Sequence, residues 1–422
     1  MADKTPDISS GDEKQVLKKK EIMFDKLVKE KKGKDFFDAY RNFGDGTFSL
    51  IEGKYFICSG FCDLHVHFRE PGFFYKESIK SGSLAGARGG YTTVCTMPNL
   101  SPAPDTLENL NVQREIIKKD AVIEVIPYGT ITKGEKGDEL SDMRSLAPYV
   151  CAFSDDGRGV QSDDMMRLAM EKAKSLDKII SAHCEDNSLL KGGCIHDGEW
   201  AKLHGFIGIS SESEYKQLER DLRLAKEIGV RYHVCHISTK ESVELIRNAK
   251  KEGVSVTCET APHYLVLTEN DLRDEGRFKM NPPVRSEEDK RALIEGVIDG
   301  TIDAIATDHA PHSKEEKSKG LKDSAFGIVG LETAFPLLYT RLVKENVITL
   351  QRLVELMSDN PRKIFDIKKR NNDYTVFEIE NPYKISPEDF LSKGRSTPFE
   401  GDEVFGRCVL TVKDDKTVYS CL

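Results

Sequence analysis

The residue types and spacing between Asp63 and Gly72 suit the binding of a metal ion and of an anion. This stretch follows residues 55–58, an aromatic and β-branched run that predicts a buried strand. Residues two apart on a strand face the same side, so His65 and His67 can direct two imidazoles at one point while Leu64 and Val66 pack the other way. Imidazole is a common zinc ligand. Arg69, at the strand's exit, has a planar guanidinium suited to gripping a carboxylate.

The His-x-His pair alone is weak evidence for a metal site, because either imidazole can simply be hydrogen-bonded at a strand end. The elements that would position these residues carry more weight. Eight short apolar segments predict strands, and most are separated by amphipathic stretches that predict helices. This alternation favours an α/β fold, a (β/α)8 TIM-type barrel with a parallel sheet. The predicted strands are 54–66, 91–97, 122–128, 149–153, 178–183, 231–236, 254–259 and 302–307.

The two ends of the chain differ in character from the predicted barrel, which spans residues 58–366. Residues 1–34 are charged and lysine-rich with a rough helical periodicity, which predicts a solvated arm or peripheral helix. Residues 35–57 and 367–422 together predict a small β-rich appendage. In the second of these segments, 374–380 and 404–420 are typical of short antiparallel strands.

Composition excludes several classes of function. The net charge of −9 argues against nucleic-acid binding as the main activity. No apolar run approaches the ~20 residues needed to span a bilayer, and no apolar signal core follows the N-terminal methionine. The ten cysteines include no Cys-x-x-Cys pair, which suits free thiols in a reducing cytoplasm. We therefore expect a cytoplasmic enzyme or scaffold.

Barrel enzymes work at the carboxyl ends of their strands, and the candidate ligands fall there. Four histidines and at least two carboxylates at strand ends are the donor set for two metal ions, and nitrogen and oxygen donors fit zinc best, with iron, cobalt or manganese as competitors. Asp308 can contact a metal through one oxygen and handle protons with the other. The strand-end residues are His65, His67, Arg69, Asn99, Asp155, Asp156, His183, Glu185, His236, Asp308 and His312.

These motifs together resemble the bacterial dihydroorotase family of the amidohydrolase superfamily. The resemblance covers roughly residues 58 to 366, in the same order and with comparable spacing. It rests on Asp63–Gly72, Met97–Asn99, Phe153–Gly157, Ala182–Asp186, His236–Thr239, Lys279–Pro283 and Ala306–His312, and it continues into Thr397–Phe399.

The resemblance implies a role for each matching residue. His65, His67 and Asp308 would bind the first metal, His183 and His236 the second, and Asp156 would bridge both. Asp155 is the competitor for the bridging role. The residues that would hold the substrate are Arg69, Asn99 and His312 at its α-carboxylate, Asn281 at the ring, and Phe326 and Gly327 through the backbone of their loop.

The reaction implied by the resemblance is the reversible closure of N-carbamoyl-L-aspartate to L-dihydroorotate plus water, the third step of pyrimidine biosynthesis. In the hydrolytic direction a hydroxide held between two zinc ions would attack the ring amide, and Asp308 would pass a proton to the leaving nitrogen. The family also implies a homodimer. Contact with aspartate transcarbamoylase is possible but supported by no residue in the sequence.

Two alternatives compete with this prediction. The first is another cyclic amidase, an allantoinase or a hydantoinase, which residues 259–264 resemble in part. Those enzymes lack the trio of Arg69, Asn99 and His312. The second is a catalytically silent scaffold relative, which would be expected to lose metal ligands, whereas all six are present here. Among the other histidines, His263 is a candidate to support a ligand, and His196, His204 and His233 are expected to be structural or on the surface.

Overall fold

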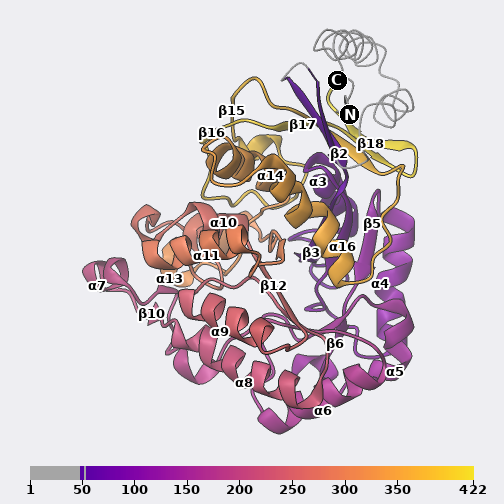
Figure 1. Cartoon of the computed structure of the whole chain (residues 1–422), viewed down its shortest axis with the longest axis vertical. Helices are drawn as coiled ribbons and strands as arrows, with labels where there is room; N and C mark the ends of the chain where they lie inside the picture. The colour runs from indigo at the N-terminus through magenta and orange to yellow at the C-terminus, as the bar shows by residue number, and fades with distance from the viewer. Residues whose placement is uncertain (1–47, 52–53) are drawn as a thin grey trace, which may run out of the picture.

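The computed structural model describes residues 48–51 and 54–422, with side chains described from residue 54 onward. The predicted arm of residues 1–34, and residues 35–47 of the predicted appendage, lie outside the described residues. The described chain is an α/β protein in which short parallel strands alternate with helices (Figure 1). Within this part of the chain, no helix combines the length and apolar character needed to cross a membrane.

The parallel strands form two hydrogen-bonded groups, β3-β4-β5 and β6-β7-β8-β11-β12-β13. Tyr128 separates β5 from β6, and its N–H donates to the carbonyl of Thr96 at 3.0 Å, which continues the ladder across the break. The bounds are β3 (Phe61–Val66), β4 (Tyr91–Thr96), β5 (Glu124–Pro127), β6 (Gly129–Thr130), β7 (Phe153–Ser154), β8 (Ile180–Ala182), β11 (Tyr232–Val234), β12 (Val256–Thr260) and β13 (Ala304–Ile305).

The first and last parallel strands also contact each other. An isolated parallel bridge joins Val66 to His309, and the N–H of His67 donates to the His309 carbonyl at 2.8 Å. Just after β13, the Thr307 hydroxyl donates to Asp63 at 2.6 Å. These contacts bring the carboxyl ends of β3 and β13 together, which is the arrangement that the predicted barrel needs.

Helices follow the strands, and short polar side chains mark where several of them begin. Ser78 and Ser286 form capping boxes with Ser81 and Asp289, and Thr239 caps α9 by accepting from the N–H of Ser242. The helices are α3 (Ile79–Arg88), α4 (Leu107–Asp120), α5 (Met143–Leu146), α6 (Asp163–Ser175), α7 (Glu199–His204), α8 (Glu212–Ile228), α9 (Lys240–Lys251), α10 (Pro262–Val266), α11 (Glu287–Asp299), α12 (Lys314–Lys317), α13 (Gly320–Asp323), α14 (Ala334–Leu338), α15 (Leu350–Val354) and α16 (Asn360–Ile364).

The predicted strand 54–66 is divided at Gly60 into two strands that belong to different sheets. β2 (Tyr55–Ser59) joins an antiparallel sheet, whereas β3 joins the parallel one. The backbone of Gly60 passes so close to Thr92 that an added Cβ would lie 2.2 Å from its side chain, so the crossing point requires glycine. The predicted strand 149–153 is also shifted: residues 147–149 form a 3-10 turn, and the strand begins at Phe153.

Both ends of the described chain contribute to one five-stranded antiparallel sheet, in the order β1-β2-β14-β17-β18. Its strands are β1 (Phe48–Ile51), β2, β14 (Tyr374–Glu378), β17 (Arg407–Lys413) and β18 (Lys416–Ser420). Phe56 and Phe377 of this sheet pack with Phe61 and Phe335, and the Phe335 and Phe377 rings stack 3.9 Å apart between centroids. These apolar contacts attach the sheet to the parallel strands and their helices.

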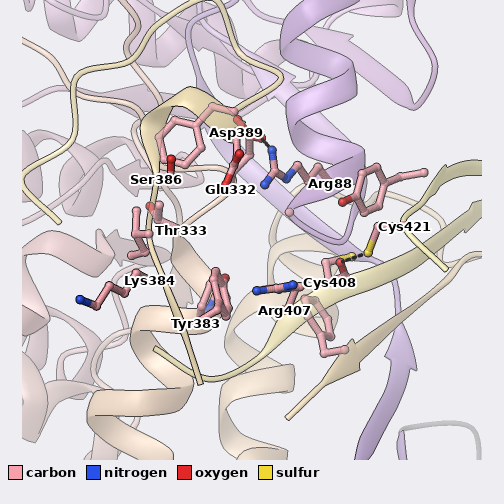
Figure 2. Close-up of a pocket in the computed structure, with 16 residues that line it drawn as sticks. Arg88, Glu332, Thr333, Tyr383, Lys384, Ser386, Asp389, Arg407, Cys408 and Cys421 are labelled. Atoms are coloured by element: carbon pink, nitrogen blue, oxygen red, sulfur yellow. Dashed lines mark hydrogen bonds and ion pairs between the residues drawn. The ribbon is translucent and has the colours of Figure 1, made fainter. Parts of the chain in front are cut away.

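A cavity of about 190 Å³ lies where α3 and the residues before α14 meet the antiparallel sheet (Figure 2). In this view Arg88 extends toward Glu332, and their side chains pair at 3.4 Å. Arg407 lies on the β17 side and stacks over the Tyr383 ring, 4.5 Å from its centroid. None of the predicted site residues lines this cavity, so the candidate chemistry lies elsewhere in the described structure.

Candidate active site

The six predicted metal ligands converge in one buried cluster, although they come from five different strand ends. Asp156, just after β7, faces His65 of β3 and His67 directly after it: its carboxylate oxygens are 3.3 Å from His65 Nε2 and 3.4 Å from His67 Nε2. Asp308, just after β13, places Oδ1 3.2 Å from His67 Nε2 and 3.6 Å from His65 Nε2. All four side chains are buried.

The other two histidines also face Asp156, and the His236 ring lies 4.8 Å from that of His65 between centroids. His183 and His236, after β8 and β11, bring Nδ1 and Nε2 to 3.0 Å from each other. The same two nitrogens are 3.8 Å and 3.7 Å from Asp156 Oδ1. Asp156 is therefore the carboxylate that all four imidazoles approach: its Oδ1 faces His65, His183 and His236, and its Oδ2 faces His67.

The donor set fits metal ions on two grounds. Donors that bind zinc at ~2.0–2.2 Å in a tetrahedron stand about 3.3 Å apart, which matches the separations around Asp156. In addition, His65 Nε2 and Asp156 Oδ1 are buried and make no hydrogen bond to any described residue. Buried polar atoms left without a partner are costly, and a bound cation would satisfy them.

Asp155, the competitor for the bridging position, is engaged elsewhere. Its carboxylate accepts hydrogen bonds from the backbone N–H of Ile131 at 2.8 Å and from the backbone and hydroxyl of Thr132. Asp155 thus holds the chain after β6 in place, while its neighbour Asp156 faces the imidazoles.

Three residues at this edge adopt a left-handed backbone that L side chains rarely take. The φ angles are +58° at Arg69, +30° at His236 and +48° at Asp308. Such conformations persist only where the surroundings impose them, and they concentrate at functional sites. Here each of them lies two or three residues beyond the end of a strand, namely β3, β11 or β13.

The prediction that Leu64 and Val66 pack on the same side of β3 is wrong. Leu64 packs with Cys62 and Met97 in one apolar cluster, whereas Val66 belongs to the main core cluster, so the two do not share a face. The pairing of β3 with β4 shifts register between Asp63 and Val66. A bulge of this kind re-aims side chains, and His65 and His67 still converge, with ring centroids 5.3 Å apart.

Glu259, at the end of β12, is a functional residue that the sequence interpretation missed. Its two oxygens lie 3.2 Å from His65 Nδ1 and 3.2 Å from His233 Nε2, and all three side chains are buried. Burial opposes the charge of Glu259, but its hydrogen bonds with His233 and His65 prevail and lower its pKa to about 2. Such a carboxylate fixes which imidazole nitrogen faces a metal. Its position at a predicted strand end was the available signal.

Arg69 and His312 form the predicted anion clamp beside the donor cluster. Arg69 is 9% exposed and donates from Nε to the Pro311 carbonyl at 3.3 Å, and its Nη2 lies 3.3 Å from His312 Nε2. No carboxylate among the described residues lies within the 4.0 Å of an ion pair with this guanidinium. A buried cation without an anionic partner is expensive, so the site is suited to an incoming anion.

Asn99, the third residue predicted to hold the carboxylate, and the predicted ring-binding residues lie around the same cluster but have protein partners of their own. Asn99 Oδ1 accepts from His67 Nδ1 at 2.9 Å, so this residue orients a metal-ligand candidate. Asn281 donates to Glu185 at 2.8 Å, which leaves its buried Oδ1 without a partner. Gly327 has φ +129°, and its N–H donates to the Lys279 carbonyl at 3.0 Å. Phe326 lies under the Lys279 ammonium, 4.4 Å from the ring centroid.

The remaining histidines are either buried residues outside the donor cluster or residues at the surface. His309 contacts Glu77 at 3.3 Å and accepts from the Gly330 N–H, so it is not one of the converging donors. His263 is buried, and in the described structure its ring makes no hydrogen bond to a ligand candidate. His196 faces Arg285, and His204 stacks on Trp200 at the surface.

A buried cluster of four imidazoles and two carboxylates at the strand ends of an α/β fold defines a hydrolase of the amidohydrolase type. Solved structures agree with this class. The L-hydantoinase (dihydropyrimidinase) of Arthrobacter aurescens superimposes with a TM-score of 0.78 at 27% identity, covering 87% of this chain and 86% of that one. The dihydropyrimidinase of Brevibacillus agri, at 20% identity and a TM-score of 0.76, covers 87% and 85% and shares the fold.

Sequence relatives make the assignment narrower. A family model described as Dihydro-orotase-like matches residues 53–242. A dihydroorotase of Fusobacterium nucleatum is 53% identical over 86% of this chain and 87% of its own length, and one of Staphylococcus epidermidis is 48% identical over 96% of both. The chain belongs to the dihydroorotase family.

Proposed function

We propose that this protein is a dihydroorotase, which interconverts N-carbamoyl-L-aspartate and L-dihydroorotate plus water in pyrimidine biosynthesis. One observation carries the proposal: the buried donor cluster lies beside Arg69, a buried guanidinium with no carboxylate in ion-pairing range among the described residues. A cyclic amide that carries a carboxylate would satisfy both parts of this site at once.

We infer that the cluster binds two divalent ions, with zinc best suited to its nitrogen and oxygen donors. His65, His67 and Asp308 would hold one ion, His183 and His236 the other, and Asp156 both. When bound, such ions supply a Lewis acid and a nucleophilic water at neutral pH.

The chain's own residues would then position the substrate and move a proton. Asp308 directs Oδ1 at the imidazoles, which leaves its second oxygen to take a proton from the nucleophile and deliver it to the leaving ring nitrogen. In the synthetic direction the same oxygen would deprotonate the carbamoyl nitrogen. Arg69, Asn99 and His312 would hold the α-carboxylate, which supplies orientation and charge complementarity.

The ring would be held by the remaining predicted residues. The unpartnered Oδ1 of Asn281 can accept a hydrogen bond from a ring N–H. Because the Gly327 N–H is already donated to Lys279, the segment Phe326–Gly327 would contribute its free carbonyl groups. An added Cβ at Gly327 would lie 2.6 Å from the Ala310 carbonyl, so only glycine allows this approach.

We further propose that residues 58–366 form a closed (β/α)8 barrel, supported by the bridge between Val66 and His309. The segments 35–57 and 367–422 would form the β-rich appendage, supported by the five-stranded sheet. A cytoplasmic location suits the ten free cysteines, of which Cys421 is exposed. A homodimer and a contact with aspartate transcarbamoylase stay predictions from the family resemblance.

The test is the hydrolysis of L-dihydroorotate, followed by its ultraviolet absorbance, with metal content determined on the same preparation. Hydantoin and allantoin serve as control substrates, because the similarity in fold to L-hydantoinase makes a hydantoinase the second candidate. Turnover of dihydroorotate alone with about two metals per chain supports the proposal. Turnover of hydantoin in preference to dihydroorotate would overturn it.

A further inference from the structure

The imidazole of His312 faces a cationic donor with each of its ring nitrogens. Arg69 Nη2 is 3.3 Å from Nε2, and Lys76 Nζ is 3.3 Å from Nδ1. Burial and the charges of Arg69 and Lys76 lower the pKa of His312 to about 3, so the ring is neutral near pH 7. A neutral imidazole has one N–H and one acceptor nitrogen, whereas guanidinium and ammonium groups only donate. His312 can therefore accept only one of these two hydrogen bonds.

Glu316 adds a competing acceptor at Nδ1. Its Oε2 lies 3.4 Å from Nδ1, and its Oε1 accepts from Lys76 Nζ at 2.8 Å. The ring can thus donate from Nδ1 to Glu316, or it can accept at Nδ1 from Lys76 and carry its proton on Nε2. An Nδ1 proton would point toward the ammonium of Lys76, and an Nε2 proton would point toward the guanidinium of Arg69 at the same distance of 3.3 Å. A carboxylate bound between Arg69 and His312 would accept from both groups and remove the conflict at Nε2. The conflict at Nδ1 would stay, and Glu316 Oε2 already accepts the backbone N–H of Ser313 at 2.9 Å. With a carboxylate bound, the contacts therefore favour the tautomer that is protonated on Nε2.

The choice of tautomer decides what His312 can offer to a ligand. An Nε2 lone pair cannot donate to a carboxylate, whereas an Nε2–H beside Arg69 presents two donors to the same anion. We propose that Lys76 is a positioning residue that holds His312 in the tautomer protonated on Nε2, so that Arg69 and His312 together bind the substrate carboxylate. This inference rests on the proposed function for the identity of the carboxylate, whereas the tautomer depends only on a carboxylate being bound beside Arg69.

Kinetics provide the first test. Lys76→Met removes the donor at Nδ1 and leaves Glu316 to accept the ring proton, so we expect the KM for dihydroorotate to rise about 10- to 100-fold with kcat nearly unchanged. Lys76→Arg keeps a donor and should recover most of the loss. Lys80→Met, four residues along the chain on the exposed face of α3, makes the same change of charge and should leave KM unaltered.

A spectroscopic test separates this role from a purely structural one. Histidine labelled with ¹⁵N reports the tautomer of each ring through long-range ¹H–¹⁵N correlations, and the signal of His312 is assigned by its loss in His312→Gln. The spectra are recorded with malonate added, as a carboxylate that is not turned over. We expect the Nε2–H tautomer in the wild-type zinc-loaded enzyme and the Nδ1–H tautomer in Lys76→Met.

An Nδ1–H ring in the wild type would overturn the inference, as would a Lys76→Met variant with unchanged KM or with a loss confined to kcat. If the wild type turns over another cyclic amide in place of dihydroorotate, the proposed function fails. The tautomer comparison between wild type and Lys76→Met would still stand or fall by itself.

Discussion

The strand-end donor cluster and the aromatic side chains of the five-stranded antiparallel sheet are both buried, yet they are built on opposite principles. Around Asp156 the chain leaves polar atoms without hydrogen-bond partners and holds His236 and Asp308 at positive φ. In the sheet, Phe56 and Phe377 stack on Phe335, and the backbone pairs strand to strand. The donor cluster around Asp156 is therefore expected to lower the free energy of unfolding, whereas the antiparallel sheet is expected to raise it. Substitutions should therefore separate activity from folding.

The substitution that should lower activity most, with the least effect on folding, is at Asp308. Replacing it by asparagine keeps the shape and tolerates the left-handed backbone but removes the proton-carrying oxygen, so turnover should fall by about 10²–10⁴-fold. The urea midpoint should stay close to that of the wild type. Asp323→Asn, an exposed change nearby, is the control. Turnover of Asp308→Asn within tenfold of the wild type would remove Asp308 from its assigned role.

The opposite result, a loss of stability without a loss of turnover, is expected for a substitution in the antiparallel sheet. Phe377→Ala deletes a fully buried ring that contacts Phe56, Phe61 and Phe335, and it should lower the free energy of unfolding by about 3–5 kcal/mol. The molecules that remain folded should turn over substrate normally. Equilibrium urea unfolding measures the first effect, and Phe74→Ala, at an exposed ring, should change stability by less than ~0.5 kcal/mol. An equal loss in both variants would contradict the role of the aromatic cluster.

An intermediate effect on zinc affinity is expected at Glu259, which contacts a metal-ligand candidate without being one itself. Glu259→Gln weakens the link to His65 and His233, and zinc affinity should fall about 10- to 100-fold. Competition with a chromophoric chelator gives the dissociation constant. Glu252→Gln, an exposed change, is the matched control. Unaltered zinc affinity in Glu259→Gln would mean that the carboxylate does not orient His65.

A pH-dependent effect is expected at Glu332, which lines the cavity beside the antiparallel sheet. Burial raises its pKa from 4.5 to about 7, against the hydrogen bonds from Leu391 and Ser392 and the charge of Arg88. Between these values the folded state binds a proton that the unfolded chain has released, so this group lowers stability progressively as the pH rises from 4.5 to about 7. In Glu332→Gln the decline in the urea midpoint across this range should be smaller than in the wild type. Part of the decline should stay, because burial also raises the pKa values of Asp63, Asp155 and Asp221. Parallel wild-type and variant profiles would contradict the shift.

Sequence patterns predicted the parts of the molecule that depend on short-range order. Paired histidines on a strand and donors at strand ends lie close together, as expected, because parallel strands bring their carboxyl ends to one edge. The wrong predictions concern irregularities in the strands, which a hydrophobic pattern does not encode. The bulge after Asp63 breaks the alternation of Leu64 and Val66, and the turn at Gly60 divides a continuous apolar run.

The supporting contacts were missed for a related reason. Glu259 contacts His65 across 194 positions of sequence, and Lys76 reaches His312 across 236, so neither pair has a local signature. Each becomes visible only when side-chain distances are known. Sequence therefore located the reacting groups more readily than the groups that orient them.

The division at Gly60 also has a mechanical consequence. A single residue, Gly60, links β2 to β3. Its N–H donates to the Asp373 carbonyl at 3.2 Å, and its carbonyl accepts from the Ser358 hydroxyl at 3.0 Å. Because the link between the two sheets is one hydrogen-bonded residue, neither sheet can rotate as a rigid body relative to the other. Loss of one sheet would pull directly on the strand that carries His65, so heating should produce a single cooperative heat-absorption peak in place of two separate transitions.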